Sequence, residues 1–484
     1  MLVACAAWLG ATLCAAAPLG ERTHGGHILP LPLANAIIAS GLSPKSFGLY
    51  AQEVEGERSV LALNEELPYT MASTAKIVTS LAALDLLGPY YRWRTSAFAL
   101  GTLGDGKLVG DLLIVDGGNA QLTSAELSAW FARMRAQGLR EIDGDIVLDR
   151  YAFQLSPADH ARTPAQSAGA PRHVWPDAMT LDEGVLGIVI EPAPGKRPLL
   201  ALQQALADVQ IDNRVTMKHG CDASPRWEPG LDGRATVVVT GQWSAACGTR
   251  TINFVPPPDS GVAARALPSM WAAAGGVLRG RVVSAPVVAG VSPIPTGPDG
   301  EPLQPLSFHR SKALPEVVRD INKISDNVAA RNLMLSLSPG FPGRPATLVG
   351  AQRSVERWLQ GQGMADGDVE IENGSGLSHS ERAKPRALVQ LLRKAWRADQ
   401  AQAFFDSLPI AGVDGTLKHR MLGGQAMGQA FLKTGSLNDT RALAGYVRAA
   451  SGRMYAVALM VNATDPARGR PALDAMVEWL AKNG

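Results

Sequence analysis

The sequence predicts an α/β (α+β) protein whose central sheet is formed from both ends of the chain, with a long section inserted between them. Two short strands and a helix are expected within residues 46–87. Three strands and a closing helix are expected within residues 429–484. Residues 165–260 differ from both ends, because they are rich in proline, glycine and β-branched runs. A chain of 484 residues also exceeds what one hydrophobic core usually holds, so several domains are expected.

Helical periodicity and turn signals define the elements of the first part of the chain. Apolar residues keep helical spacing after Ser73 until Gly88-Pro89 stops the run, Gly104-Asp105-Gly106 indicates a hairpin, and Thr123 with Glu126 forms a capping box. In order, we expect a helix at 33–41, strands at 46–54 and 59–64, a helix from 73 to 87, a hairpin across 95–115, a helix at 123–138 and a strand at 143–149.

The second part of the chain changes from strands to helices and back to strands. Residues 165–260 are expected to be mainly β, and Ser451-Gly452 is expected to form a tight turn near the end of the chain. After residue 260 we expect a helix at 261–278, a connector rich in proline and glycine at 285–305, helices at 313–324 and 327–337, strands at 429–435, 442–449 and 454–462, and a helix that begins at Pro471.

Composition and charge exclude several classes of protein. Charged residues make up 19% of the chain and hydrophobic residues 46%, which is typical of a folded globular protein. The formal net charge is +2, and lysine and arginine are scattered, so we expect no nucleic-acid partner. The eight histidines lack metal-ligand spacing such as His-x-x-x-His, so no metal and no cofactor are expected.

The N-terminus has the pattern of an export signal. An apolar, uncharged run extends from residue 2 to Gly20, and small residues at 14–17 precede the change to polar sequence. We predict a signal peptide at residues 1–17 and a periplasmic location. A retained anchor is the less favoured alternative, because the run is short for a spanning helix. The start of translation and a weak association with the membrane or with a cell-wall complex stay open.

Cysteine usage agrees with export. Two of the four cysteines lie within the predicted signal, which leaves Cys221 and Cys247. In an oxidising compartment this pair is a disulfide candidate that would close a loop of about 26 residues. Two buried thiols are the alternative.

Ser73 and Lys76 form the first candidate catalytic pair. They are spaced i, i+3, which places both side chains on one face of a helix. A serine hydroxyl needs a base before it becomes a good nucleophile, and a lysine acts as that base only when it is neutral. Burial and a neighbouring positive charge both lower the pKa of a lysine. Alone, the pair is more often a helix cap beside a solvated lysine.

Two further motifs strengthen the catalytic interpretation. Ser325, Asp326 and Asn327 fall between two predicted helices, where a turn would present their side chains. Lys433-Thr434-Gly435 ends an apolar strand, and a glycine there would let a substrate backbone approach the strand edge. Each motif alone is usually structural. Ser-x-x-Lys, Ser-Asp-Asn and Lys-Thr-Gly in this order are the signature of penicillin-binding proteins and class A β-lactamases.

The resemblance extends beyond the three motifs. The segments "MASTAKIVTSLAALDLLGPYYRWRT", "KISDNVAARNL", "ENGSGLS", "LPIAGVDGTLKHRM" and "FLKTGSLNDTRALAGYV" are similar to the low-molecular-mass class C penicillin-binding proteins, which are D-alanyl-D-alanine carboxypeptidases and endopeptidases. The resemblance implies a β-lactamase/transpeptidase-like core, with a central antiparallel sheet flanked by helices and two nested inserted domains rich in β structure.

The implied domains follow the long interval between the first and second motifs. A transpeptidase-like catalytic domain would comprise residues 27–95 and 306–484. An inserted α+β domain would comprise residues 96–165 and 260–305, and a nested, mainly β domain residues 166–259. The chain departs from the family pattern at Met71, which replaces the usual proline, at Arg331, where glutamate is frequent, and at "VDGGNAQLT" in the inserted section.

The resemblance also implies the role of each motif. Ser73 would attack the carbonyl between the two terminal D-alanines of a peptidoglycan stem peptide, and Lys76 would take its proton. Ser325 would bridge Lys76 to Lys433 and return the proton to the leaving amine. Asn327 would donate a hydrogen bond to the substrate amide.

The third motif is assigned to substrate binding. Lys433 would keep Lys76 neutral through its charge and, with Thr434 and Ser436, bind the terminal carboxylate beside Gly435. The backbone N–H groups of Ser73 and Ser436 would form the oxyanion hole. Cross-links between stem peptides would be further substrates. Because no Glu-x-x-x-Asn element for deacylation is evident, β-lactams are expected to form a long-lived acyl-enzyme.

Two alternative functions stay open at this stage. A β-lactamase or serine esterase on the same core would turn over a cephalosporin instead of being trapped by it. A non-catalytic cell-wall-binding protein could retain the fold, although the intact motifs argue against it.

Overall fold

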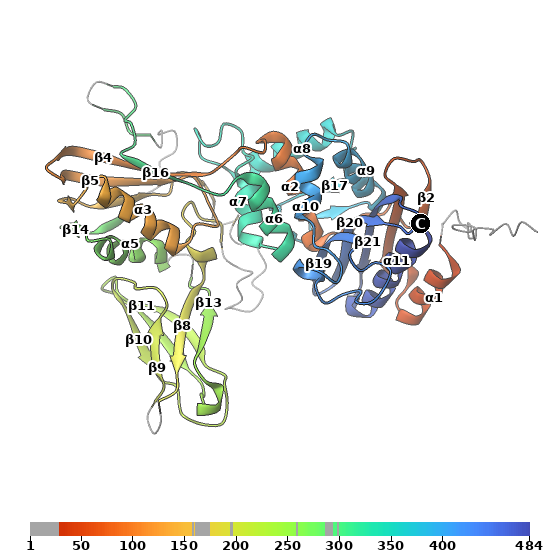
Figure 1. The fold of residues 1–484 in the computed structure, drawn as a ribbon, viewed down its shortest axis with the longest axis horizontal. Helices are drawn as coiled ribbons and strands as arrows, with labels where there is room; N and C mark the ends of the chain where they lie inside the picture. The colour runs from red at the N-terminus through yellow and green to blue at the C-terminus, as the bar shows by residue number, and fades with distance from the viewer. Residues whose placement is uncertain are drawn as a thin grey trace, which may run out of the picture.

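The computed structural model describes residues 29–156, 159, 175–193, 197–257, 260–285, 294–297 and 300–484. The predicted signal peptide, residues 1–17, lies outside the described residues. Among the helices within the described ranges, none is long and apolar enough to cross a membrane. Figure 1 shows one body that contains both ends of the described chain and a second that is formed from its middle.

A five-stranded antiparallel sheet joins the two ends of the chain in the strand order β19-β20-β21-β1-β2. Its strands are β1 (Phe47–Glu53), β2 (Ser59–Leu63), β19 (Ala430–Leu437), β20 (Thr440–Arg448) and β21 (Met454–Asn462). The N-terminal strand β1 pairs with the C-terminal strand β21, so both ends of the chain contribute to one sheet, as predicted. We call this region the split core, residues 29–93 and 311–484.

Nearly every residue of these strands is buried, because helices cover both faces of the sheet. Along β20, Leu443 packs with the helices of one face, whereas its neighbours Ala442 and Ala444 pack with those of the other. One face carries α1 (Leu31–Ser40) and α11 (Arg470–Asn483). The other carries α2 (Ala75–Leu86), α6 (Leu314–Ile324), α7 (Asn327–Leu335), α8 (Leu348–Gly361), α9 (Pro385–Trp396) and α10 (Ala401–Ser407).

A second sheet, built on the predicted hairpin, forms the middle section (Figure 1). Asp105 and Gly106 both have positive φ, which is the conformation that a two-residue hairpin turn requires. The strands are β4 (Arg94–Gly104), β5 (Lys107–Asp116), β6 (Glu141–Ile142), β7 (Ile146–Asp149), β14 (Val277–Leu278), β15 (Val282–Ala285) and β16 (Ser307–Arg310). Helices α3 (Ser124–Ala136) and α5 (Val262–Ala273) pack on it through buried Trp130 and Trp271.

Two details of the middle section differ from the expected boundaries. The helix expected at 261–278 ends at Ala273, because Gly275 has φ +80° and the chain then enters β14. Strand β16 follows the expected boundary at residue 305, yet it pairs with β4 and so belongs to this sheet.

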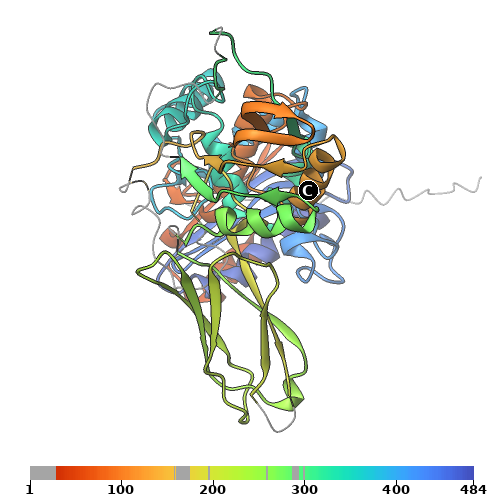
Figure 2. The same ribbon diagram turned by 90° about the vertical axis from the view of Figure 1, so that its left-hand side faces the viewer.

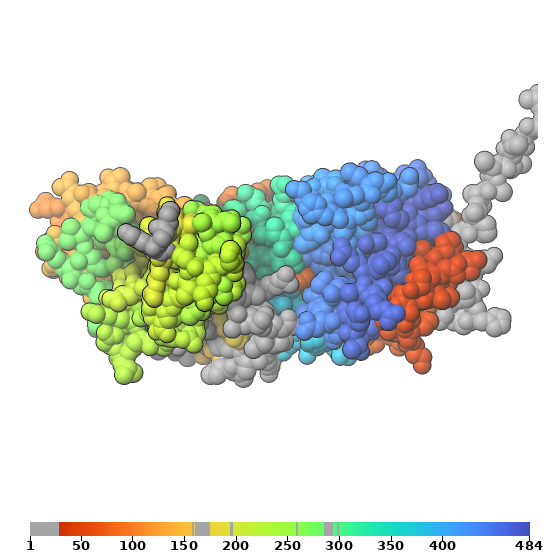
Figure 3. Space-filling model, turned by 90° about the horizontal axis from the view of Figure 1, so that it is seen from below, coloured from red at the N-terminus to blue at the C-terminus, as the bar shows by residue number. Residues whose placement is uncertain are grey.

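The nested section consists of two small sheets with their own hydrophobic core. Its strands are β8 (Leu186–Glu191), β9 (Leu199–Leu202), β10 (Val209–Asn213), β11 (Ser224–Pro229), β12 (Ala235–Thr240) and β13 (Arg250–Phe254). Figures 1 and 2 show it projecting from the middle section, and Figure 3 shows its yellow and green surface apart from the blue C-terminal segments.

The nested section contains a disulfide between Cys221 and Cys247, whose Cα atoms are 5.9 Å apart. Replacing both cysteines with alanine is expected to destabilise this section by about 3 kcal/mol, because the unfolded loop regains its conformational freedom. The stability of the split core should not change. Hydrogen exchange of β11 and β12 checks the first expectation, and equal protection in both proteins would contradict it.

Candidate active site

Ser73 lies in a short 3-10 helix, η2 (Ala72–Thr74), that leads directly into α2. Ala72 has φ +46°, so the chain turns sharply before the serine. Lys76 follows in the first turn of α2, and its Nζ lies 3.0 Å from Ser73 Oγ. Ser73 is half-buried whereas Lys76 is fully buried, so the hydroxyl is open to a ligand and the amine is not.

The second motif forms the turn between α6 and α7. Ser325 ends α6 with φ +62°, and Asp326 caps α7 by accepting a hydrogen bond from the N–H of Ala329 at 3.0 Å. This arrangement turns Asn327 toward the lysine, whose Nζ donates to Asn327 Oδ1 at 2.7 Å. The predicted turn therefore brings its side chains to the Ser73–Lys76 pair.

The third motif lies on β19, which is the edge strand of the five-stranded sheet. Figure 1 shows β19 on the side of the split core that faces the middle section. The fully buried Lys433 donates to Ser325 Oγ at 2.9 Å. Thr434 Oγ1 lies 2.8 Å from Thr416 Oγ1, and Ser436 is exposed. Three segments that are distant in the sequence are thus linked by the hydrogen bonds from Lys76 to Asn327 and from Lys433 to Ser325.

We predicted that Ser325 alone would bridge Lys76 and Lys433, but two different residues make these contacts. Ser325 contacts Lys433, and Asn327 contacts Lys76. The sequence-based assignment had Asn327 donating to substrate through its amide. In the structure Asn327 Oδ1 accepts from Lys76 Nζ, and the donation to substrate stays a prediction.

Burial lowers the pKa of Lys76 to about 7, even though the carboxyls of Glu381 and Asp326 act in the opposite direction. A neutral amine is therefore accessible near physiological pH. Burial and the charge of Lys76 also lower the pKa of Lys433 well below its usual value. We expected both burial and a neighbouring positive charge to lower the pKa of Lys76, and burial is the largest cause.

A loop that the motif analysis left without a role completes the contacts of the lysine. The backbone carbonyl of Ser375 accepts hydrogen bonds from Lys76 Nζ and, at 3.5 Å, from Ser73 Oγ. Gly374 and Gly376 flank it with φ near +80°. A Cβ on Gly376 would lie 1.9 Å from the carbonyl oxygen of Ala72 and 2.6 Å from the nitrogen of Ser73, so the loop packs directly on the backbone at Ser73. The only sequence signal for this contact is the pair of glycines in "ENGSGLS".

Backbone geometry supplies candidate donors beside the hydroxyl. The N–H of Ser73 belongs to the first turn of a helical segment, where N–H groups have no partner within the helix. Gly435 packs against the η2 segment, because a Cβ there would lie 2.6 Å from the carbonyl oxygen of Met71. The following residue, Ser436, is thereby held close to the nucleophile's segment.

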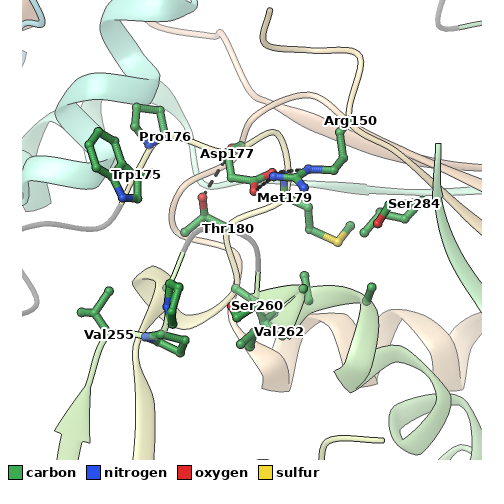
Figure 4. Close-up of a pocket in the computed structure, with 18 residues that line it drawn as sticks. Arg150, Trp175, Pro176, Asp177, Met179, Thr180, Val255, Ser260, Val262 and Ser284 are labelled. Atoms are coloured by element: carbon green, nitrogen blue, oxygen red, sulfur yellow. Dashed lines mark hydrogen bonds and ion pairs between the residues drawn. The ribbon is translucent and has the colours of Figure 1, made fainter. Parts of the chain in front are cut away.

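A pocket of about 160 Å³ lies away from the three motifs, at the boundary between the middle and nested sections (Figure 4). Asp177 is paired with Arg150 on one wall, and Val255, Ser260 and Val262 line the opposite side. It contains none of the predicted catalytic side chains. Within the described ranges, no group of three His, Cys, Asp or Glu side chains is arranged to bind a metal ion.

Comparison with known proteins identifies the architecture. The crystal structure of penicillin binding protein 4 (dacB) from Haemophilus influenzae superposes with a TM-score of 0.76 at 22% identity, over 94% of this chain and 100% of that one. The same protein complexed with a novel β-lactam superposes with a TM-score of 0.72 at 22% identity, over the same shares of both chains. This similarity confirms the predicted fold class.

Sequence comparison gives the same assignment. A D-alanyl-D-alanine carboxypeptidase from Actinomadura sp. (strain R39) is 29% identical over 399 residues, which are 79% of this chain and 71% of the relative. D-alanyl-D-alanine carboxypeptidase DacB from Haemophilus influenzae is 25% identical over 466 residues, 89% of each chain. The model of the D-Ala-D-Ala carboxypeptidase 3 (S13) family matches residues 32–483. The predicted family and enzyme class are thereby confirmed: the chain belongs to the D-Ala-D-Ala carboxypeptidase 3 (S13) family.

Proposed function

We propose that the protein is a serine-type DD-peptidase that cleaves the terminal D-Ala-D-Ala bond of peptidoglycan stem peptides through an acyl-enzyme on Ser73. The observation that carries the proposal is the 3.0 Å contact between Ser73 Oγ and the Nζ of a buried lysine whose pKa is lowered to about 7. Membership of the carboxypeptidase family supports the same substrate class.

In the proposed mechanism, neutral Lys76 takes the hydroxyl proton as Ser73 Oγ bonds to the carbonyl carbon of the penultimate D-alanine. The N–H groups of Ser73 and Ser436 stabilise the oxyanion, and each is worth about 3–4 kcal/mol of barrier. When the C–N bond breaks, Lys76 returns the proton to the amine of the leaving D-alanine. Ser325, which accepts from Lys433 in the structure, would relay this proton once the substrate brings the leaving amine between it and Lys76. Water then hydrolyses the ester.

Substrate binding is proposed at the edge of the sheet. β19 pairs with β20 on one side, and on its other side residues 409–411 hydrogen-bond to Ala430 and Leu432. We propose that an extended stem peptide pairs with the part of this edge beyond Leu432. Lys433, Thr434 and Ser436 would bind the terminal carboxylate. Cross-links in which meso-diaminopimelate supplies the leaving amine would react in the same way, and β-lactams would acylate Ser73. We propose the periplasm as the location of this reaction, after removal of the predicted signal.

Mass spectrometry after incubation with penicillin tests the proposal. We expect one stable adduct per molecule, on the peptide that contains Ser73, and release of D-alanine from a stem-peptide mimic. Ser73→Ala should abolish both, whereas Ser59→Ala, at the start of β2 on the opposite edge of the sheet from β19, should change neither. Rapid turnover of penicillin would indicate a β-lactamase instead. Absence of both adduct and D-alanine release would indicate a non-catalytic protein.

A further inference from the structure

The side chain of Glu381 is fully buried. Its carboxylate accepts hydrogen bonds from backbone N–H groups of the loop at residues 372–376. Its Oε1 accepts hydrogen bonds from the N–H groups of Glu372, Asn373 and Gly374 at 3.3, 3.0 and 2.6 Å. Its Oε2 accepts from the N–H of Gly376 at 2.6 Å. A buried carboxylate without such donors would be costly, so the loop and the anion stabilise each other.

The remaining N–H of this loop is held by a second side chain. Asn373 Oδ1 accepts from the N–H of Ser375 at 3.0 Å and from its hydroxyl at 2.5 Å. Each backbone N–H from 372 to 376 therefore has a defined acceptor. These hydrogen bonds orient the backbone carbonyl of Ser375, which accepts a hydrogen bond from Lys76 Nζ.

The backbone of Glu381 is tied to the nucleophile as well. Its carbonyl accepts a hydrogen bond from the N–H of Met71 at 2.9 Å. It lies immediately before β18 (Arg382–Ala383), which pairs with β3 (Tyr69–Thr70), the strand that leads into the Ser73 turn. One residue thus connects the strand before the nucleophile with the loop that contacts the base.

The charged groups around Lys76 come from several elements. Glu381 and Asp326 favour the charged form of Lys76, and the charge of Lys76 in turn lowers the pKa of Lys433 on β19. Glu381 also interacts with Arg331 of α7, which is buried and lies 5.6 Å from the ring of Trp175. Glu381 therefore interacts electrostatically with two buried basic side chains, while burial raises the pKa of its own carboxyl and the backbone hydrogen bonds act in the opposite direction.

We propose that Glu381 is a positioning residue for the base: its carboxylate folds the 372–376 loop so that the Ser375 carbonyl holds Lys76 Nζ against Ser73 Oγ. The inference rests on the proposed function because it takes Lys76 as the base. The negative charge of Glu381 also acts on Lys76. Loss of this charge should therefore shift the pH dependence of acylation, which loss of a purely structural residue would not do.

The test compares rate constants of acylation by a fluorescent penicillin between pH 5 and 9. In the wild type, acylation should rise with pH through about 7, where Lys76 becomes neutral. Glu381→Gln should lower the plateau about 10- to 100-fold, because the base is displaced. It should also shift the half-maximal rate to lower pH by roughly one unit, because an anion that favours the charged lysine is lost.

Two variants separate geometry from charge, and a third is a control. Glu381→Asp and Asn373→Ala keep the charge and disturb the loop, so each should lower the plateau without the shift in pH. Glu316→Gln is the matched control, since this exposed glutamate accepts from the N–H of Ala313 at 3.2 Å at the start of α6. It should leave both quantities unchanged.

The outcomes distinguish this inference from the proposed function. Wild-type rates in Glu381→Asp and Asn373→Ala would overturn the inference even if Glu381→Gln failed to fold. A loss of folded protein with an unchanged rate per titrated active site would reduce Glu381 to a structural role. If Lys76→Met acylated at the wild-type rate, the proposed base itself would be wrong.

Discussion

Replacing Lys76 with methionine is expected to lower the rate of acylation by penicillin up to about 10⁴-fold, which is the upper range for loss of a general base. Methionine is unbranched like lysine and only one atom shorter, so the loss should reflect chemistry more than packing. The fold should survive, because removing a buried ammonium also removes the cost of its desolvation. A labelling time course, with thermal unfolding measured in parallel, checks both statements.

Lys482→Met provides the control for this substitution. Lys482 is an exposed residue near the end of α11, and it takes no part in the three motifs. Its variant should be labelled at the wild-type rate. Residual acylation of Lys76→Met within tenfold of the wild type would show that another group removes the proton from Ser73.

Replacing Gly376 with alanine is expected to abolish labelling and to lower the free energy of unfolding by roughly 3 kcal/mol. The residue has φ +81°, and its new Cβ would lie 1.9 Å from the Ala72 carbonyl oxygen and 2.6 Å from the Ser73 nitrogen. Either the loop that contains Gly376 or the backbone at Ala72 and Ser73 would have to move. Chemical denaturation and penicillin labelling measure the two effects.

Gly367→Ala separates steric conflict from backbone strain. Gly367 has a similar φ of +79°, but no atom lies within 4 Å of the position of its Cβ. Its substitution should cost only about 1–2 kcal/mol, from the left-handed backbone alone, and should leave labelling intact. Equal effects in the two variants would contradict the proposed contact between the loop and the nucleophile's backbone.

Much of the fold could be predicted because its signals are local. The Asp105-Gly106 turn and the Thr123–Glu126 capping box occur where the sequence predicts them. The expected helix at 261–278 was too long at its C-terminal end, since the apolar pattern continues through Gly275 into a short strand. Strand β16 was assigned outside the middle sheet, because its pairing with β4 is a long-range contact that no local pattern indicates.

The site was predictable to the extent that its chemistry is carried by reactive side chains at fixed spacing. Ser73, Lys76 and the two later motifs contain such side chains. Glu381 could not be assigned in this way, because it acts by accepting backbone hydrogen bonds and any loop sequence offers N–H groups. Nor could the sequence rank burial above the charge of Lys433 as the cause of a lowered pKa for Lys76, since burial is a property of the assembled core.

The split core also determines when the enzyme can first act. The reactive hydroxyl is contributed by a segment near the beginning of the polypeptide, but the lysine partner of Ser325 is on a strand close to its end. A nascent chain that is still being synthesised holds the serine without its surroundings. The three motifs can therefore assemble only after nearly the whole polypeptide has been made.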